Sequence, residues 1–215
     1  MAKKEMIESI LMHNKDRRNL KNIIKALGKV DRKFFVNAEN PYVDAPISIG
    51  YNQTISQPRA VARMLSLLEL TKGQSVLEIG SGSGWNAALL AYIANPGKVI
   101  SVERIRELNE LAQQNLKSAK LNLKNIEFIF ADAMSKNGLW KIKFDRIIAT
   151  AAADPDFKED LIEMAKNLLN ENGLILFPTT DGNLELWRFK EKGLKRIYLE
   201  YGYAFVPLVK GTQQF

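Results

Sequence analysis

Apolar positions recur with two different periods along this 215-residue chain. Between residues 75 and 177, short apolar runs typical of buried strands alternate with longer segments in which apolar residues return every three or four positions, as in helices. The strands predicted in this way are 75–79, 98–102, 126–130, 144–149 and 174–177. Such strand–helix alternation predicts a parallel sheet with right-handed crossovers.

The two ends of the chain depart from this alternation. Residues 1–30 predict two short amphipathic helices with a break at 14–18, and Asp31 is placed to cap a third helix. Residues 184–189 and 194–203 are typical of an antiparallel strand pair. We therefore expect an α/β fold with a doubly wound, mostly parallel sheet, antiparallel strands near the C-terminus and an N-terminal helical extension.

Two boundaries depend on local turn chemistry. Residues 42–56 lack a helical period and are rich in proline, glycine and small polar residues, which predicts a long loop before a helix that begins at Pro58. Loops of this length inside a compact domain are usually functional. By spacing alone, however, Ser56 is a cap for the helix that follows. The last helix of the alternating region is predicted to close at Asn172-Gly173.

The first strand of the alternating region runs directly into a glycine-rich turn, in the stretch VLEIGSGSGW. Glycines leave no Cβ between the backbone and a ligand, so a nucleotide-like group can lie against the N–H groups at the helix start. The order Glu78-x-Gly80-x-Gly82-x-Gly84 differs from the dinucleotide fingerprint because a carboxylate precedes the first glycine. That carboxylate disfavours a pyrophosphate and favours a cationic amino-acid group. The structural alternative is that the glycines only let the helix pack closely on the sheet.

Further polar residues end the neighbouring predicted strands. Glu103 follows Glu78 by 25 positions, where the carboxylate of a βαβ unit accepts hydrogen bonds from ribose hydroxyls. Asp132 and Thr150 follow the next two strands, and Asp132 is placed to meet an adenine amino group, although an aspartate there is also an ordinary turn residue. This arrangement resembles the cofactor site of the S-adenosylmethionine-dependent methyltransferases with a Rossmann-like fold. The predicted cofactor-binding residues are Glu78, Gly80, Ser81, Gly82, Gly84, Glu103, Asp132, Ala133 and Thr150.

Composition removes several kinds of chemistry. The chain has no cysteine, which excludes disulfides, thiolate metal sites and a cysteine nucleophile. Its only histidine is His13, so a tetrahedral zinc site has almost no ligands to draw on and we expect no metal. General-base chemistry by histidine is equally hard to place, which favours an acceptor that needs no help in losing its proton.

The net charge of +7 weakly favours the binding of anionic partners. Basic residues are interleaved with acids along the chain, which favours a solvated surface over a nucleic-acid-binding face. No apolar run approaches the length of a membrane span, and the N-terminus lacks the apolar core of a signal peptide. We expect a cytoplasmic monomer with no stable nucleic-acid partner and no membrane association.

Several longer segments carry a more specific pattern than the glycine turn. They are YVDAPISIGYNQTISQPRAVARMLSLLEL, VLEIGSGSGWNAALLA, VISVERI, the strand end at Asp132, FDRIIATAAA, NGLILFP and the terminal FVPLVKG. Together they resemble the protein-L-isoaspartate O-methyltransferase family. The glycine motif alone is typical of many methyltransferases, whereas QTISQP and FVPLVKG are much more specific.

The resemblance implies a reaction. S-adenosylmethionine would be the methyl donor, S-adenosylhomocysteine the product, and the acceptor the free α-carboxylate of L-isoaspartyl residues in damaged proteins and peptides. In that family the TIS segment lines the active site and its serine is assigned to catalysis, so Thr54 and Ser56 become the predicted catalytic residues. A carboxylate of pKa about 3.5 is already ionised at neutral pH, so no base is needed.

The resemblance also implies a single methyltransferase domain over residues 1–215, with a C-terminal segment that folds over the cofactor. We divide it into a helical N-terminal extension, an acceptor loop and helix, a cofactor-binding core, and C-terminal strands and tail: 1–40, 41–72, 73–180 and 181–215.

Two alternatives stay open from the sequence. An RNA or other small-group methyltransferase would suit the net charge, but the fourth strand leads to ATAAAD rather than to the Asn/Asp-Pro-Pro-aromatic motif of amine methylation. A non-catalytic nucleic-acid-binding module with a retained cofactor pocket is the other. The acidic and glycine residues of the cofactor motif are all present, which argues against the loss of catalytic activity that this alternative requires.

Overall fold

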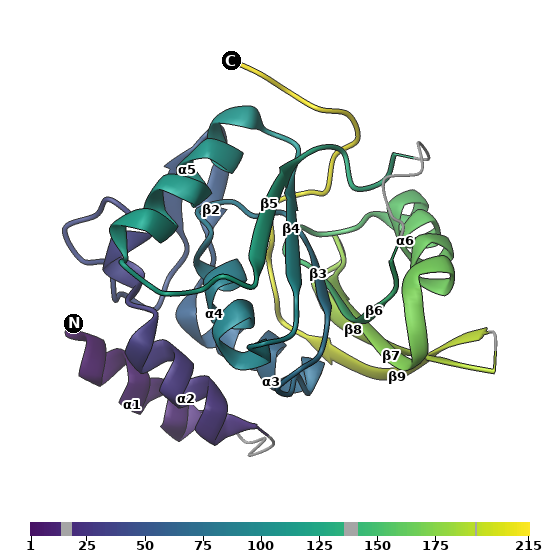
Figure 1. Ribbon diagram of the computed structural model, residues 1–215, viewed down its shortest axis with the longest axis horizontal. Coiled ribbons are helices and arrows are strands. Elements are labelled where there is room, and N and C mark those ends of the chain that lie inside the picture. The colour runs from purple at the N-terminus through teal and green to yellow at the C-terminus, as the bar shows by residue number, and fades with distance from the viewer. Residues whose placement is uncertain (14–18, 136–141, 192) are drawn as a thin grey trace.

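The computed structural model describes residues 1–13, 19–135, 142–191 and 193–215. Its main sheet has the strand order β5-β4-β3-β6-β7-β8-β9 (Figure 1). The strands are β3 (Val76–Ile79), β4 (Val99–Glu103), β5 (Ile126–Phe130), β6 (Phe144–Ala149), β7 (Leu169–Pro178), β8 (Asn183–Lys190) and β9 (Gly193–Tyr201). Neighbours from β5 to β7 are parallel, whereas β8 and β9 are antiparallel additions. The predicted fold class is confirmed.

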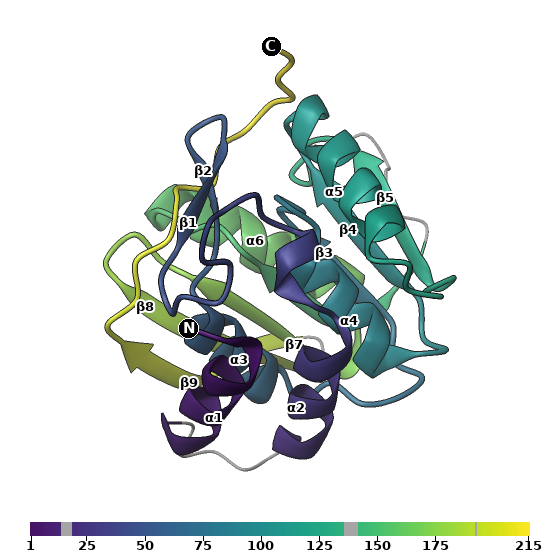
Figure 2. The same cartoon turned by 90° about the vertical axis from the view of Figure 1, so that its left-hand side faces the viewer.

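Helices cover both faces of this sheet, with α6 on the face opposite α3 and α4 (Figures 1 and 2). The helices are α1 (Lys3–His13), α2 (Leu20–Lys29), α3 (Pro58–Leu68), α4 (Trp85–Ala94), α5 (Arg106–Ser118) and α6 (Pro155–Leu168). Alternate side chains of β3 enter opposite cores, Val76 on the α4 side and Leu77 on the α6 side. All four residues of β3 are buried, as expected for a central parallel strand.

The N-terminal extension follows the sequence prediction closely. Helices α1 and α2 are both present and pack outside α3 and α4. The predicted break at 14–18 lies outside the described residues. Asp31 does act as a cap, because its side chain accepts a hydrogen bond from Lys33 N, but it caps only the 3₁₀ turn η1 (Arg32–Phe34).

The segment 42–56 is not simply a loop, and this prediction was wrong. It contains an antiparallel hairpin of β1 (Ile47–Gly50) and β2 (Gln53–Ile55). Tyr51 and Asn52 connect them with positive φ angles of 53° and 56°, the backbone that tight two-residue hairpins require. Strands of three and four residues are too short to give a recognisable period in sequence.

The predicted end of the last helix was also wrong. Helix α6 ends at Leu168, and Asn172-Gly173 lies within β7. Leu169 is fully buried and pairs with Phe144, and the Asn170 amide donates to the Asp145 carboxylate at 2.9 Å. The residues that resemble a helix end therefore form an irregularity in a strand.

After β9 the chain crosses the carboxyl ends of the parallel strands. The Ala152 N–H donates to Val206 O at 2.7 Å, and the Leu208 N–H donates to Ala152 O at 2.8 Å. Further on, the Phe215 ring packs against Tyr51 at the tip of the hairpin in a tilted arrangement, with ring centroids 4.9 Å apart. The hairpin and this tail, residues 202–215, lie side by side over one edge of the sheet (Figure 2).

Candidate active site

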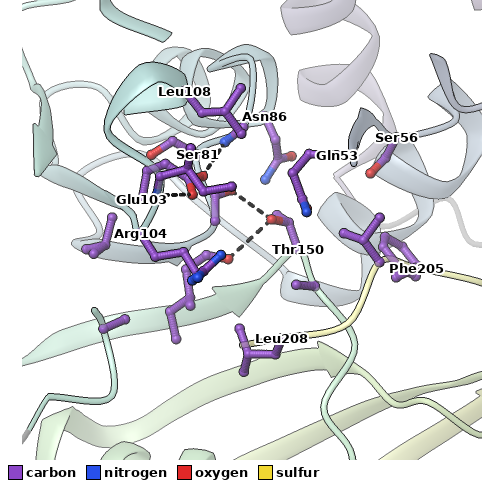
Figure 3. A pocket seen from close by; sticks show the side chains of 18 of the residues that line it. Gln53, Ser56, Ser81, Asn86, Glu103, Arg104, Leu108, Thr150, Phe205 and Leu208 are labelled. Carbon is purple, nitrogen blue, oxygen red and sulfur yellow. Dashed lines mark hydrogen bonds between the residues drawn. The ribbon is translucent and has the colours of Figure 1, made fainter. Parts of the chain in front are cut away.

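Two adjoining cavities lie at this edge, beneath the hairpin and the tail. The inner cavity is lined by the glycine turn, by the ends of β4, β5 and β6, and by residues 205–209. The outer cavity is lined by α1, by the start of α3 and by residues 198 and 200–206, and its volume is about 900 Å³. Both are lined by Thr54, Ser56, Thr150, Phe205 and Val206. In Figure 3, Glu103 and Ser81 lie at one end of the inner cavity and Ser56 and Phe205 at the other.

The glycine turn brings two strand ends close together. Gly80 has a φ of 96°, and a Cβ there would lie 2.5 Å from Thr150 Oγ1. The Thr150 hydroxyl donates to Gly80 O at 2.7 Å, so it fastens the end of β6 to the turn. At Gly84 a Cβ would meet Ala112 of α5 at 3.0 Å. The packing interpretation therefore accounts for Gly84, which does not line either cavity.

Glu103 lines the inner cavity with only 5% of its surface exposed. Its carboxylate accepts hydrogen bonds from Gly82 N at 2.9 Å and Ile105 N at 3.0 Å. Burial raises the pKa of Glu103, and these backbone donors oppose the rise. A carboxylate offers about four lone-pair positions, so two remain to accept bonds from a ligand.

Glu78 lies beneath the turn instead of on a cavity wall. Its fully buried carboxylate accepts bonds from the Ser101 hydroxyl and from Asn86 Nδ2, the latter at 2.7 Å. The Ser101 oxygen is in turn 2.6 Å from that of Ser81, which does line the cavity. Burial, reinforced by the nearby charge of Glu103, raises the pKa of Glu78 to about 8. The structure thus gives Glu78 no direct path to the ligand space, because its side chain points toward α4.

Asp132 joins the inner cavity to the tail. One carboxylate oxygen accepts from Met134 N at 2.9 Å, as in an ordinary turn, and the other from Gly211 N at 2.8 Å. Ala133 beside it is buried. The predicted residues that line the inner cavity together are Thr54, Ser56, Gly80, Ser81, Gly82, Glu103, Asp132, Ala133 and Thr150.

Ser56 does not cap the helix that follows it. The N-cap of α3 is Gln57, whose side chain makes no cap bond, and the side chain that does bond to this helix end is Asp44, which accepts from Arg59 N at 3.0 Å. Within the described part of the chain, the hydroxyls of Ser56 and Thr54 have no hydrogen-bond partner. Both side chains therefore offer donors where the two cavities meet.

Arg32 is a supporting residue that sequence reasoning missed. Its side chain is fully buried, and the guanidinium lies 5.2 Å from the Trp85 ring centroid. Its NH2 donates to Ser56 O at 3.0 Å, and its NH1 donates to Pro41 O. Arg32 thereby fixes the backbone that carries Ser56. No periodic pattern marks a buried arginine, so the sequence held no signal for it.

Two absences concern the described residues alone. Across 1–13, 19–135, 142–191 and 193–215, no three His, Asp or Glu side chains gather as a metal site would require. None of the helices described here combines the length and apolar character needed to span a membrane.

The parallel sheet, the glycine turn and a strand-end carboxylate at one edge define a Rossmann-like α/β protein with a nucleoside-binding edge. The family model described as Protein-L-isoaspartate(D-aspartate) O-methyltransferase (PCMT) matches residues 1–213, and the chain belongs to this family. The resemblance seen in the sequence is confirmed.

Individual relatives of this family are similar to the chain over most of its length. A protein-L-isoaspartate O-methyltransferase of Methanothrix thermoacetophila is 36% identical over 97% of this chain and 95% of its own. One from Pyrococcus horikoshii is 40% identical over 86% of this chain and 83% of its own. A Plasmodium falciparum structure bearing the same family name, in complex with S-adenosyl-L-homocysteine, superposes with a TM-score of 0.81. It shares 26% identity and covers 97% of this chain and 99% of its own.

Proposed function

We propose that this chain is an S-adenosylmethionine-dependent protein-L-isoaspartate O-methyltransferase. It transfers a methyl group to the free α-carboxylate of L-isoaspartyl residues in damaged proteins and peptides. The observation that carries this proposal is the meeting of two cavities at Thr54 and Ser56. A nucleoside-binding cavity and an acceptor cavity must share one wall if a methyl group is to pass directly from donor to acceptor.

The inner cavity has donors and acceptors that suit S-adenosylmethionine. Gly80, Ser81 and Gly82 of the turn line this cavity, and Glu103 keeps two lone-pair positions for ribose hydroxyls. Asp132 lies where an adenine amino group could donate to it. When bound, the cofactor supplies a methyl group on a sulfonium centre. Family membership and the S-adenosylhomocysteine complex of the Plasmodium relative support this assignment.

Covering of the inner cavity is part of the proposal. With the tail and hairpin in place it encloses about 100 Å³, well below the roughly 300–1,000 Å³ of typical ligand pockets. We infer that the tail opens to admit the cofactor and then excludes water. The bond from Gly211 N to Asp132 and the backbone bonds of Val206 and Leu208 with Ala152 are among the contacts that would have to loosen.

The acceptor half needs positioning and no proton removal, because an α-carboxylate is ionised at neutral pH. Ser56 and Thr54 supply the hydroxyl donors that hold it, and Phe205 and Val206 form the wall between the two cavities. An outer cavity of about 900 Å³ has room for residues flanking the acceptor. The proposed division is acceptor binding by residues 41–72 and cofactor binding by 73–180.

We further propose that the protein acts as a cytoplasmic monomer without a nucleic-acid partner. The substrate assay that tests the main proposal uses two synthetic peptides that differ only in an aspartyl or isoaspartyl linkage. With radiolabelled S-adenosylmethionine, base-labile label should enter only the isoaspartyl peptide. Equal labelling of both peptides, or labelling of RNA with neither peptide labelled, would overturn the assignment and favour the RNA alternative.

A further inference from the structure

The outer cavity contains cations that already have anionic partners. Arg59 and Arg63 both line it from α3, one helical turn apart. The Arg59 guanidinium is paired with the Asp44 carboxylate, whose other oxygen accepts from Arg59 N at 3.0 Å. The Arg63 guanidinium is paired with Glu200, at the end of β9. Both arginines beside the acceptor loop are therefore held by carboxylates of the chain itself.

The pairing of Glu200 with Arg63 is the better defined of the two. Glu200 Oε2 accepts from Arg63 Nε at 2.8 Å and lies 2.7 Å from Arg63 NH2. Tyr198 donates to the same oxygen and Tyr203 to Oε1, each at 2.9 Å. Burial opposes ionisation of Glu200, but these donors together lower its pKa, so it stays ionised; burial likewise opposes the charge of Arg63, and Glu200 is the main partner that raises the pKa of Arg63.

This arrangement contrasts with the hydroxyls that face the same space. Ser56 and Thr54 have no hydrogen-bond partner among the described residues, whereas the strongest carboxylate-binding group nearby, Arg63, already holds a carboxylate. An arginine fork binds carboxylates in a bidentate manner and more tightly than a hydroxyl does. Without a counter-ion, Arg63 would attract any carboxylate of a substrate protein, away from the junction of the two cavities.

We propose that Glu200 is a specificity-determining residue: it occupies Arg63, so that substrate carboxylates are not captured in the outer cavity and only one seated at Thr54 and Ser56 is held. This rests on the proposed function, because it takes the outer cavity to be the acceptor site. The carboxylates rejected in this way are those of aspartyl and glutamyl side chains, which every protein substrate carries.

The test is direct binding of an aspartyl peptide in the presence of S-adenosylhomocysteine, measured by calorimetry. Glu200→Gln keeps the size and an acceptor oxygen but removes the charge that neutralises Arg63. We expect the aspartyl peptide to bind about two- to fivefold more tightly to this variant, the scale of a partly exposed ion pair. The gain should shrink as salt is raised. An unchanged affinity would overturn the proposal.

A double variant, Glu200→Gln with Arg63→Gln, separates occupation of Arg63 from a general disturbance of the cavity. It removes both charges of the pair, so the gain in affinity for the aspartyl peptide should vanish. Its KM for an isoaspartyl peptide should stay within about twofold of the wild-type value, because neither charge is left unpaired. A severalfold rise in that KM would mean that Arg63 binds the acceptor itself and would overturn the proposal, even if Glu200→Gln alone does not fold.

The matched control is Glu163→Gln, which removes the same charge from an exposed pair with Lys166 on α6. It should change none of these values. In the methylation assay with the isoaspartyl peptide, Glu200→Gln should lower KM and kcat together, because a peptide carboxylate bound at Arg63 is held unproductively. The affinity of this variant for S-adenosylhomocysteine should stay the same. Failure of the wild-type protein to methylate the isoaspartyl peptide would count against the proposed function alone, since the binding comparison needs no turnover.

Discussion

The two cavities treat charge in opposite ways. In the inner cavity, Glu103 is a buried carboxylate that accepts hydrogen bonds from backbone N–H groups and has no ion pair among the described residues. In the outer cavity, Arg59 and Arg63 are each neutralised by a carboxylate. The difference matches the proposed ligands. A cationic cofactor benefits from a carboxylate without a counter-ion, whereas an anionic acceptor would be captured by arginines without one.

The largest expected effect is at the junction of the two cavities. Ser56→Ala removes one positioned donor from the acceptor carboxylate, so methyl transfer should slow on the order of ten- to a thousandfold. Because the serine is placed on the acceptor side, calorimetric affinity for S-adenosylhomocysteine should stay nearly intact. A matching loss in cofactor affinity would contradict the assignment of Ser56 to the acceptor rather than to the cofactor.

The next effect tests the floor of the inner cavity. Gly80→Ala combines a positive φ with a Cβ only 2.5 Å from Thr150 Oγ1, while Gly50→Ala has a similar φ of 89° and open space around it. The backbone strain alone should destabilise either variant by about 1–3 kcal/mol. Gly80→Ala should lose more than Gly50→Ala in thermal unfolding and should also bind S-adenosylhomocysteine less tightly. Equal losses in the two variants would show that the contact with Thr150 is unimportant.

Removing the inner carboxylate should affect only the cofactor. Glu103→Ala should weaken S-adenosylhomocysteine binding by roughly 1.5–3 kcal/mol, the range for a lost charge-assisted hydrogen bond. Calorimetry with the free protein measures this directly. Affinity equal to that of the wild type would remove Glu103 from the cofactor site. A changed affinity for the aspartyl peptide would show that the inner and outer cavities do not bind their ligands separately.

The smallest effect is a pH dependence of stability that arises beneath the turn. Burial raises the pKa of Glu78 from its ordinary 4.5 to about 8, so the folded protein holds a proton that the unfolded chain releases. The stability from this proton is full below about pH 4.5 and is lost as pH rises toward 8. Glu78→Gln has no proton to release there, so its unfolding midpoint should fall less between pH 5 and 8 than that of the wild type. Parallel pH profiles would contradict the raised pKa.

Much of the cofactor half could be predicted because its signals are local. Burial on both faces of β3 and β4 requires mostly apolar runs, and the strand-to-helix turn requires glycine at Gly80. Glu103 follows from the rule that ligands of parallel sheets bind at the strand ends. Each of these features depends on a few consecutive residues, so the sequence alone determined the sheet, the turn and the side of the sheet on which the site lies.

Tertiary structure decided where side chains point and which distant residues meet, because local sequence patterns do not contain this information. Glu78 belongs to the motif, yet its side chain points under the turn, because alternate residues of a strand face opposite sides. Arg32 reaches Ser56 across 24 positions, and Arg63 meets Glu200 across 137. Hydrogen bonds between such distant residues form only after the sheet and its helices have packed, and no periodicity in sequence records them. The sequence therefore determined where the cavities lie, and only the packing of distant segments determined which charges in them are neutralised.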